Sequence, residues 1–224
     1  TMHFYFLILL SLVQYKLLIS ADDLGKVIIS PNKSLYQLDK SGASILLIEK
    51  KEIEESPSTT ISGLLQEYGG FSVATKGNKG SDSSYFNRGL ARKYIKVLVD
   101  GMDLSDITST QEEPTYIDDI SKNNIGTIEI LNGSQGTMYG GDAIGGVISI
   151  NSNKATKLGL TQENTLQGGS YGTINNSHLF KFLNNRVNFA LTVDSERSTG
   201  YSSFIDTGLS PFEKDGYYLY GGSL

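Results

Sequence analysis

The chain has 224 residues and a formal net charge of −5, with 19 Lys and Arg residues against 24 Asp and Glu residues. An acidic balance of this kind argues against a nucleic-acid-binding surface. The absence of cysteine excludes disulfides, thiolate metal sites and thiol catalysis within these residues. Glycine (25) and tyrosine (13) are abundant and proline (4) is scarce, which is typical of short strands and turns in an all-β or α+β protein.

The first segment of the chain is apolar. Residues 4–19 are mostly apolar, and the small residues Ser20 and Ala21 precede two aspartates. This order predicts a secretory signal peptide over residues 1–21. A membrane anchor or a buried helix is the alternative, although the uninterrupted apolar run is shorter than the about 20 residues of a membrane-spanning helix.

A short β-prone segment follows, and it reads on its own as an ordinary first strand. It consists of Lys26, Val27, Ile28, Ile29 and Ser30. Residues 44–48 predict a second strand. Residues 58–68 predict a helix, because apolar residues recur at 61, 64, 65 and 68. We expect Ser58 to be its N-cap and Gly69-Gly70 its end.

The next residues alternate between strand and loop signals. Residues 71–75 predict a strand, which with the preceding helix indicates a small α+β globule. The charged run 49–55 predicts a solvated face, and the polar run 76–84 predicts a flexible loop.

A glycine-rich elbow lies between two apolar segments, residues 128–131 and 147–150. It contains six glycines and one large side chain, Tyr139, so we expect two short strands joined by a tightly packed turn anchored by this tyrosine. A phosphate-binding loop is excluded, because no Gly-Lys-Ser/Thr follows and no Gly-x-Gly-x-x-Gly opens a helix.

The last third of the chain alternates apolar and polar residues. Residues 161–167, 177–183, 186–194 and 215–224 predict four strands, and Asn184-Asn185 predicts a hairpin turn. A soluble antiparallel sheet also alternates in this way. A transmembrane β-barrel adds segments of about ten residues and interfacial aromatics. The candidate aromatic residues are Tyr171, Tyr201, Tyr217, Tyr218 and Tyr220.

Several of these motifs together resemble the plug domain of TonB-dependent outer-membrane receptors. Phe86-Asn87-Arg88-Gly89 comes first, then a strand that ends in Asp100-Gly101. The third motif is Ile-Glu-Ile-Leu-Asn-Gly-Ser-Gln-Gly-Thr-Met-Tyr-Gly-Gly-Asp-Ala-Ile-Gly-Gly-Val-Ile-Ser-Ile. The chain departs from the family at Asn132, where arginine is usual, and at Ser134, where proline is usual.

The resemblance implies a domain order: a signal peptide (1–21), a TonB-box-like segment (22–34), an α+β plug (35–152) and about four strands of an antiparallel transmembrane β-barrel (155–224). Four strands cannot close a membrane barrel, and receptors of this type use about 22. The sequence is therefore expected to be an N-terminal fragment. In the TonB-box reading, residues 26–30 add as a strand to TonB, the energy-transducing protein of the inner membrane.

The resemblance also implies roles for single residues. Arg88 and Glu129 match charged positions that lock the plug in the family, and a routine structural ion pair is the alternative. The structural motif of the plug would comprise Asp100, Gly101, Gly133, Tyr139, Gly140, Gly145 and Gly146. The candidates for substrate-facing loop residues are Asn78, Ser83, Ser84 and Ser109, because binding residues concentrate on loops of a rigid scaffold.

The function implied is active import of a scarce nutrient across the bacterial outer membrane, with a periplasmic N-terminus and the plug inside the barrel. The motifs are most like those of cobalamin receptors, and a ferric-siderophore receptor is the alternative. Cobalamin receptors carry calcium-binding acidic loops in this region, and the availability of only Asp206, Glu213 and Asp215 here argues against calcium. An enzyme lacks support, because the two histidines belong to no catalytic constellation. A surface adhesin or signalling module is a third, less favoured class.

Overall fold

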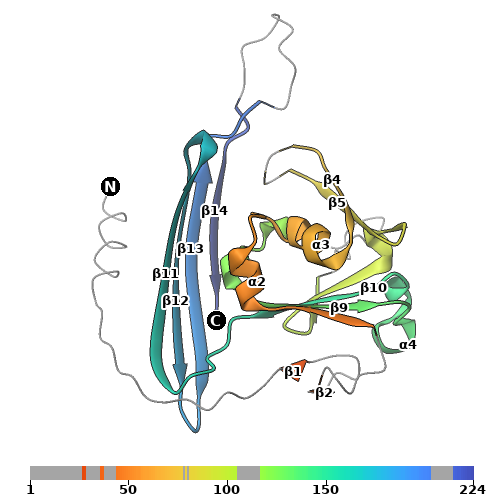
Figure 1. The fold of residues 1–224 in the computed structure, drawn as a ribbon, viewed down its shortest axis with the longest axis horizontal. Helices are drawn as coiled ribbons and strands as arrows, with labels where there is room; N and C mark the ends of the chain where they lie inside the picture. The colour runs from red at the N-terminus through yellow and green to blue at the C-terminus, as the bar shows by residue number, and fades with distance from the viewer. Residues whose placement is uncertain are drawn as a thin grey trace, which may run out of the picture.

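The structure is a computed structural model, and it describes residues 27–28, 36–37, 44–77, 79, 81–104, 117–202 and 214–224. The expected signal peptide, Lys26, Ile29, Ser30, Asn78 and Ser109 lie outside these residues. An α+β domain packs against one face of a separate four-stranded sheet, which we call the C-terminal sheet (Figure 1). The predicted order, an α+β domain followed by an antiparallel sheet, is present in the structure.

The α+β domain is built on a five-stranded sheet in the order β3-β9-β10-β7-β8. Its strands are β3 (Ile45–Ile48), β7 (Ile95–Val99), β8 (Met102–Asp103), β9 (Ile125–Asn132) and β10 (Gly146–Ser152). All neighbours are antiparallel except β10 and β7. The central strands are rich in β-branched residues that are buried on both faces of the sheet, as in β10, where six of seven residues are buried.

The two strands expected around the glycine elbow are β9 and β10, which pair directly, with Ile130 opposite Ile148. The elbow itself is more ordered than expected, because it holds the one-turn helix α4 (Gly136–Tyr139) and a 3₁₀ turn at Gly141–Ala143. The half-buried Tyr139 packs on a small cluster made of Leu98, Leu131, Ala143 and Val147. The tyrosine therefore anchors the elbow to the sheet.

The helix α3 (Ile61–Gly69) is present, but its expected N-cap was wrong. Thr60 caps it, accepting a hydrogen bond from Gly63 N at 3.2 Å. Ser58 instead donates its hydroxyl to the Glu67 carboxylate at 3.2 Å, which holds the chain outside the helix. Gly70 ends α3 in the left-handed region, at φ 69°.

The charged run 49–55 is not merely a solvated face. It forms the helix α2 (Lys50–Glu55), which begins with a capping box between Glu49 and Glu52. Ile53, the single apolar residue of this helix, is 1% exposed and joins the core. The buried Ile53 and the hydrogen bonds from Lys50 Nζ to the carbonyl oxygens of Asn123 and Ile125 dock this short helix on the domain.

The main core lies between the helices and one face of the five-stranded sheet, as Figure 1 shows for α2 and α3. Asp118 ties α3 to this core, because its carboxylate accepts hydrogen bonds from Ser62 N (2.8 Å) and Ser62 Oγ (2.7 Å). The buried members of the core are Ile48, Ile53, Ile61, Leu64, Leu65, Phe71, Tyr85, Ile95, Val97, Ile117, Ile125, Ile128, Ile130, Ile148 and Ile150.

A small three-stranded sheet joins the domain, in the order β4 (Ser72–Thr75), β5 (Ser83–Asn87) and β6 (Leu90–Ala91). β4 is the strand expected at 71–75. The polar loop expected at 76–84 is shorter than predicted, because Ser83 and Ser84 pair with Thr75 and Ala74 as part of β5. A two-residue pair, β1 (Val27–Ile28) with β2 (Tyr36–Gln37), is separate from the other three sheets.

The C-terminal sheet is an antiparallel meander of four strands. The strands are β11 (Gly159–Gly169), β12 (Thr173–Leu183), β13 (Asn188–Ser198) and β14 (Tyr217–Ser223). These match the four predicted strands. The predicted hairpin turn connects β12 and β13: Asn184 N donates to the carbonyl oxygen of Val187 at 2.9 Å, and Asn184 Oδ1 accepts hydrogen bonds from Arg186 N (2.8 Å) and Val187 N (2.7 Å).

Among the described residues, no helix has the length and apolar character that crossing a membrane requires.

Candidate functional site: the seam between the plug-like domain and the C-terminal sheet

The two faces of the C-terminal sheet differ in polarity. Along β13, the residues at 192, 194, 196 and 198 are buried, whereas 193 and 197 are exposed. The buried set faces the α+β domain and is polar: Thr192, Asp194, Glu196 and Ser198. The opposite face carries the exposed apolar side chains of Leu160, Leu166, Ile174, Phe189, Val193, Tyr218 and Tyr220, and among them lies a polar group of Asn164, Asn176 and the buried His178. The α+β domain therefore rests on the polar face of the sheet.

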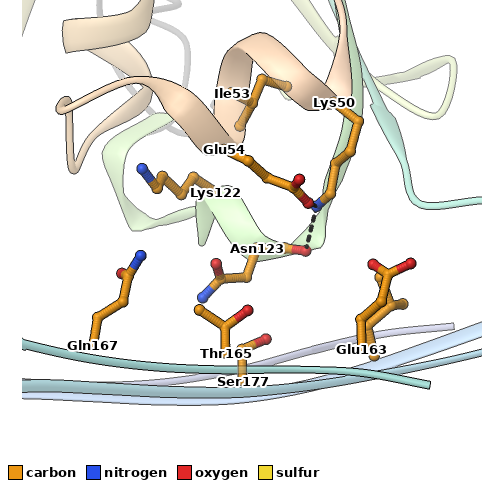
Figure 2. Close-up of a pocket in the computed structure, with 10 residues that line it drawn as sticks. Lys50, Ile53, Glu54, Lys122, Asn123, Glu163, Thr165, Gln167 and Ser177 are labelled. Atoms are coloured by element: carbon orange, nitrogen blue, oxygen red, sulfur yellow. Dashed lines mark hydrogen bonds and ion pairs between the residues drawn. The ribbon is translucent and has the colours of Figure 1, made fainter.

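A pocket of about 370 Å³ lies in this seam. Figure 2 shows Lys50, Glu54 and Lys122 of the α+β domain on one side of it. Side chains of the C-terminal sheet line the other side: Glu163, Thr165, Gln167 and Ser177. A second pocket of about 350 Å³ shares Lys122 and Gln167 with the first, so the two form one polar seam.

The two lysines of the seam hold the α+β domain together rather than reaching for a ligand. Lys50 Nζ donates hydrogen bonds to the carbonyl oxygens of Asn123 (3.3 Å) and Ile125 (3.0 Å). Lys122 Nζ donates to the carbonyl oxygens of Ser56 (3.2 Å) and Ser58 (3.0 Å). Burial lowers the pKa of both ammonium groups, because the interior disfavours their charged form.

The strongest contact across the seam converges on Glu196. Its carboxylate accepts hydrogen bonds from Lys79 Nζ (2.7 Å), Asn175 Nδ2 (3.0 Å) and Tyr217 Oη (2.5 Å). The Lys79 and Glu196 side chains are only 10% and 6% exposed. Asn175 Oδ1 in turn accepts a hydrogen bond from Asn123 Nδ2 at 3.1 Å. This group links the β4–β5 loop, the C-terminal sheet and the start of β14.

The base of the β4–β5 loop is braced by a second carboxylate. Asp82 accepts hydrogen bonds from Lys76 Nζ and Arg92 Nη1, each at 2.7 Å. Arg92 also donates to the carbonyl oxygen of Ser83 at 3.0 Å. The ammonium of Lys76 and the guanidinium of Arg92 hold the pKa of the Asp82 carboxyl below its ordinary value. The loop that carries Lys79 therefore leaves the domain from a fixed base.

The structure does not bring the two expected lock residues together. Arg88 is exposed at the turn after β5, with φ 51°. Glu129 is 1% exposed within β9, and its carboxylate accepts a hydrogen bond from Asn151 Nδ2 at 3.1 Å. Within the described part of the chain, the two residues form no ion pair with each other, so the routine ion pair weighed as the alternative is not observed.

The residues of the family motifs shape the backbone. Asp100 (φ 48°) and Gly101 (φ 81°) form the turn between β7 and β8, and Asp100 Oδ1 accepts a hydrogen bond from Ser152 N at 3.0 Å. Gly133, Gly140 and Gly146 also have positive φ. The contact of Gly145 is different: its N–H donates to the carbonyl oxygen of Tyr94 at 2.7 Å, which docks the elbow on the 3₁₀ turn Arg92–Tyr94.

The buried Asn87 is a motif residue whose contribution the sequence reasoning missed. Its Nδ2 donates hydrogen bonds to the carbonyl oxygen of Gly145 (2.9 Å) and to Asn132 Oδ1 (3.2 Å). Asn132, which stands where the family usually has arginine, therefore makes a neutral amide contact. The position of Asn87 directly before Arg88 in the Phe-Asn-Arg-Gly motif was the signal that could have revealed it.

Val27 and Ile28 of the coupling segment form β1, paired with β2. Ser83 and Ser84 are half-buried in β5. Of the three acidic residues weighed for calcium, only Asp215 lies within the described residues. Among these, no group of three or more His, Cys, Asp or Glu side chains is arranged to hold a metal ion.

Lys79, Asn175 and Glu196 were also missed, and the role expected for Tyr217 was wrong: it faces the plug and donates to Glu196 instead of lying among the interfacial aromatics. The sequence signal for Glu196 was the alternation of polar residues at 192, 194, 196 and 198, which places all four on one face of a strand. Nothing in the sequence pairs Glu196 with Lys79, because the two lie 117 residues apart.

Comparison with known proteins gives this architecture a family. A model of the TonB-dependent receptor plug domain matches residues 37–147. The vitamin B12 transporter BtuB of Vibrio vulnificus is 33% identical over 168 residues, covering 71% of this chain and 25% of the transporter. BtuB of Vibrio cholerae is 27% identical over 158 residues, covering 68% of this chain and 24% of that protein. The chain thus spans about a quarter of the length of these relatives.

Solved structures share the fold at low sequence identity. The pyoverdine outer-membrane receptor FpvA of Pseudomonas aeruginosa superposes with a TM-score of 0.66 at 14% identity, covering 84% of this chain and 28% of that chain. The ferric yersiniabactin uptake receptor FyuA of Yersinia pestis gives 0.57 at 19% identity, covering 80% of this chain and 28% of that chain. The proteins named here are transporters and receptors rather than enzymes.

Proposed function

Because this chain belongs to the TonB-dependent receptors, whose members are outer-membrane proteins, we propose that the receptor that contains it imports cobalamin across the outer membrane. The observation that carries the proposal is the 33% identity to a vitamin B12 transporter over 71% of this chain. The solved structures support the fold but not the substrate, because their identities lie below 20%. Ferric-siderophore import is therefore an outcome that the binding test must distinguish.

In this proposal the α+β domain is the plug and the C-terminal sheet is part of the barrel around it. The sheet face that contacts the plug is polar, and the opposite face carries most of the exposed apolar side chains of the sheet, as a lipid-facing surface does. The plug performs no chemistry on the nutrient. Nutrient binding changes the position of the plug only by the difference between its affinities for the resting and the displaced states.

Coupling to TonB is proposed for residues 26–30, with the N-terminal segment in the periplasm. Strand addition needs an extended segment whose main-chain groups bond to the partner. Val27 and Ile28 already adopt a strand against Tyr36 and Gln37, which supports this role. TonB binding would then replace β2 as the strand partner. The substrate-loop roles of Asn78, Ser83, Ser84 and Ser109, and the lock roles of Arg88 and Glu129, stay predictions.

Equilibrium binding to the purified full-length receptor tests the substrate. We expect tight binding of cobalamin and no binding of ferric siderophores at the same concentration. The reverse result would replace cobalamin by a ferric chelate, and binding of neither would remove both candidates.

Energised uptake in cells tests the coupling segment. Deleting residues 26–30 from the full-length receptor should abolish uptake and leave nutrient binding unchanged. Uptake at the wild-type rate would show that the coupling segment lies elsewhere.

A further inference from the structure

Two carboxylates of β13 face the plug, and the structure treats them differently. Both carboxylate oxygens of Glu196 accept hydrogen bonds, which come from Lys79, Asn175 and Tyr217. Asp194 is 5% exposed, and within the described residues its Oδ1 accepts no hydrogen bond. A buried carboxylate oxygen that accepts no hydrogen bond destabilises the fold, so its presence here needs a physical explanation.

The two carboxylates are successive members of the same row. Residues two apart on a strand face the same side and are separated by about 6–7 Å. The Lys79 ammonium acts electrostatically on Asp194 as well as pairing with Glu196. Glu196 is a second charged group that acts on Asp194, and the side chains of Ser121 and Asn124 act on the Asp194 carboxylate as hydrogen-bond donors, so the oxygen without a donor is Oδ1 alone.

The sheet leaves room for this carboxylate. Gly221 of β14 lies directly opposite Asp194. A Cβ at position 221 would lie 2.6 Å from Asp194 Oδ2. Any other residue at this position would displace the carboxylate from its present place.

We propose that Asp194 is a second acceptor for the Lys79 ammonium, occupied when the plug shifts by one two-residue period along β13. This inference rests on the proposed function, because the plug must move within its barrel during transport. Moving from Glu196 to Asp194 carries the β4–β5 loop about 6–7 Å toward the Asn188 end of β13. The ammonium then exchanges one buried carboxylate for another and is not left unpaired in the seam.

A distance measurement on the full-length receptor tests the two-acceptor arrangement. Spin labels are attached to a cysteine at Lys51 on the plug and to a second cysteine on the outward face of the sheet, at Leu160 or at Tyr218. The three side chains are 79%, 58% and 74% exposed, and the chain has no cysteine of its own. Because Leu160 and Tyr218 lie toward opposite ends of the sheet, a sliding plug changes the two distances in opposite senses.

Glu196→Gln removes the charge of the resting acceptor and keeps the shape of the side chain. We expect it to produce, without any nutrient, a population in which the distance to position 160 shortens relative to the distance to position 218 by several ångströms. Asp194→Asn alone should leave the resting distances unchanged. Adding Asp194→Asn or Lys79→Met to Glu196→Gln should remove the shifted population.

Distances in Glu196→Gln that match the parent would overturn the inference, and so would a shifted population that survives Asp194→Asn. Because the measurement needs no nutrient, its outcome is independent of whether the receptor binds cobalamin. A receptor that binds cobalamin without the shift refutes the second acceptor alone. A receptor that shows the shift but binds no cobalamin refutes only the proposed substrate.

Discussion

Replacing Gly146 by alanine tests whether the glycine elbow is a requirement of the backbone. Gly146 begins β10 with φ 125°, a conformation that residues with a side chain rarely adopt. A Cβ at this position would lie 2.5 Å from the carbonyl oxygen of Leu131 on the neighbouring strand. Both the strained backbone and the clash would oppose the pairing of β9 with β10.

The size of the effect follows from these two terms. A residue held in a sparsely populated backbone region costs about 1–3 kcal/mol, and overpacking costs about 1–3 kcal/mol. The variant should therefore lose about 2–6 kcal/mol of local stability. Since about 1.4 kcal/mol corresponds to a factor of ten, this is at least an about 30-fold increase in the opening equilibrium.

Native-state hydrogen exchange of the full-length receptor measures this opening at the amides of β9 and β10. Gly141→Ala in the same elbow is the matched control, because a Cβ there meets nothing within 4 Å and its φ is not in the positive region. The control should exchange as the wild type does. Exchange in Gly146→Ala within threefold of the control would refute the reasoning, because the strand pair would then tolerate a side chain.

Three further predictions concern single polar groups. The ion pairs of Asp82 stabilise the fold at pH values above the ordinary carboxyl pKa, and this stabilisation is lost as the pH falls through the lowered pKa of the folded state. Asp82→Asn should therefore make the melting temperature fall less steeply between pH 6 and pH 2 than it does in the wild type. Asp118→Ala leaves the Ser62 N–H and hydroxyl without their acceptor and should cost about 1–3 kcal/mol in urea unfolding, whereas unchanged stability would contradict this role. Asn188→Ala breaks two hydrogen bonds to the backbone of Ala155 (3.1 and 3.0 Å), and faster hydrogen exchange at Ala155 should report it.

The sequence predicted the elements whose signal is local. The four strands of the C-terminal sheet follow from alternation with period two, and β9 and β10 follow from apolar runs beside glycines. The helix α2 was missed because one buried residue, Ile53, is a weak signal within a charged run. The N-cap was misplaced because Ser58 and Thr60 are both good caps, and only the hydrogen bond from Ser58 to Glu67 distinguishes them.

The polar seam was harder to predict, because its contacts join residues that are distant in the chain. Lys79 read as part of a flexible polar loop, although Glu196 holds it in a buried ion pair. Arg88 and Glu129 were chosen because they match charged positions that lock the plug in the family. The fold places one of them on the surface and the other inside the sheet. The residues that share one face of a strand can thus be predicted from that segment alone. The residues from other segments that contact this face cannot.

The contrast between the core of the plug and its seam with the sheet bears on how the plug can move. The core is apolar, so exposing it to water would cost about 25 cal/mol for each Å² of apolar surface. The seam consists of hydrogen bonds and of the Lys79–Glu196 ion pair. Hydrogen bonds across a seam exchange for bonds to water at a small net free energy, but a buried charge that loses its partner does not. The ion pair is therefore the main barrier to sliding, and a second carboxylate on the same row of β13 would lower it while the plug stays folded.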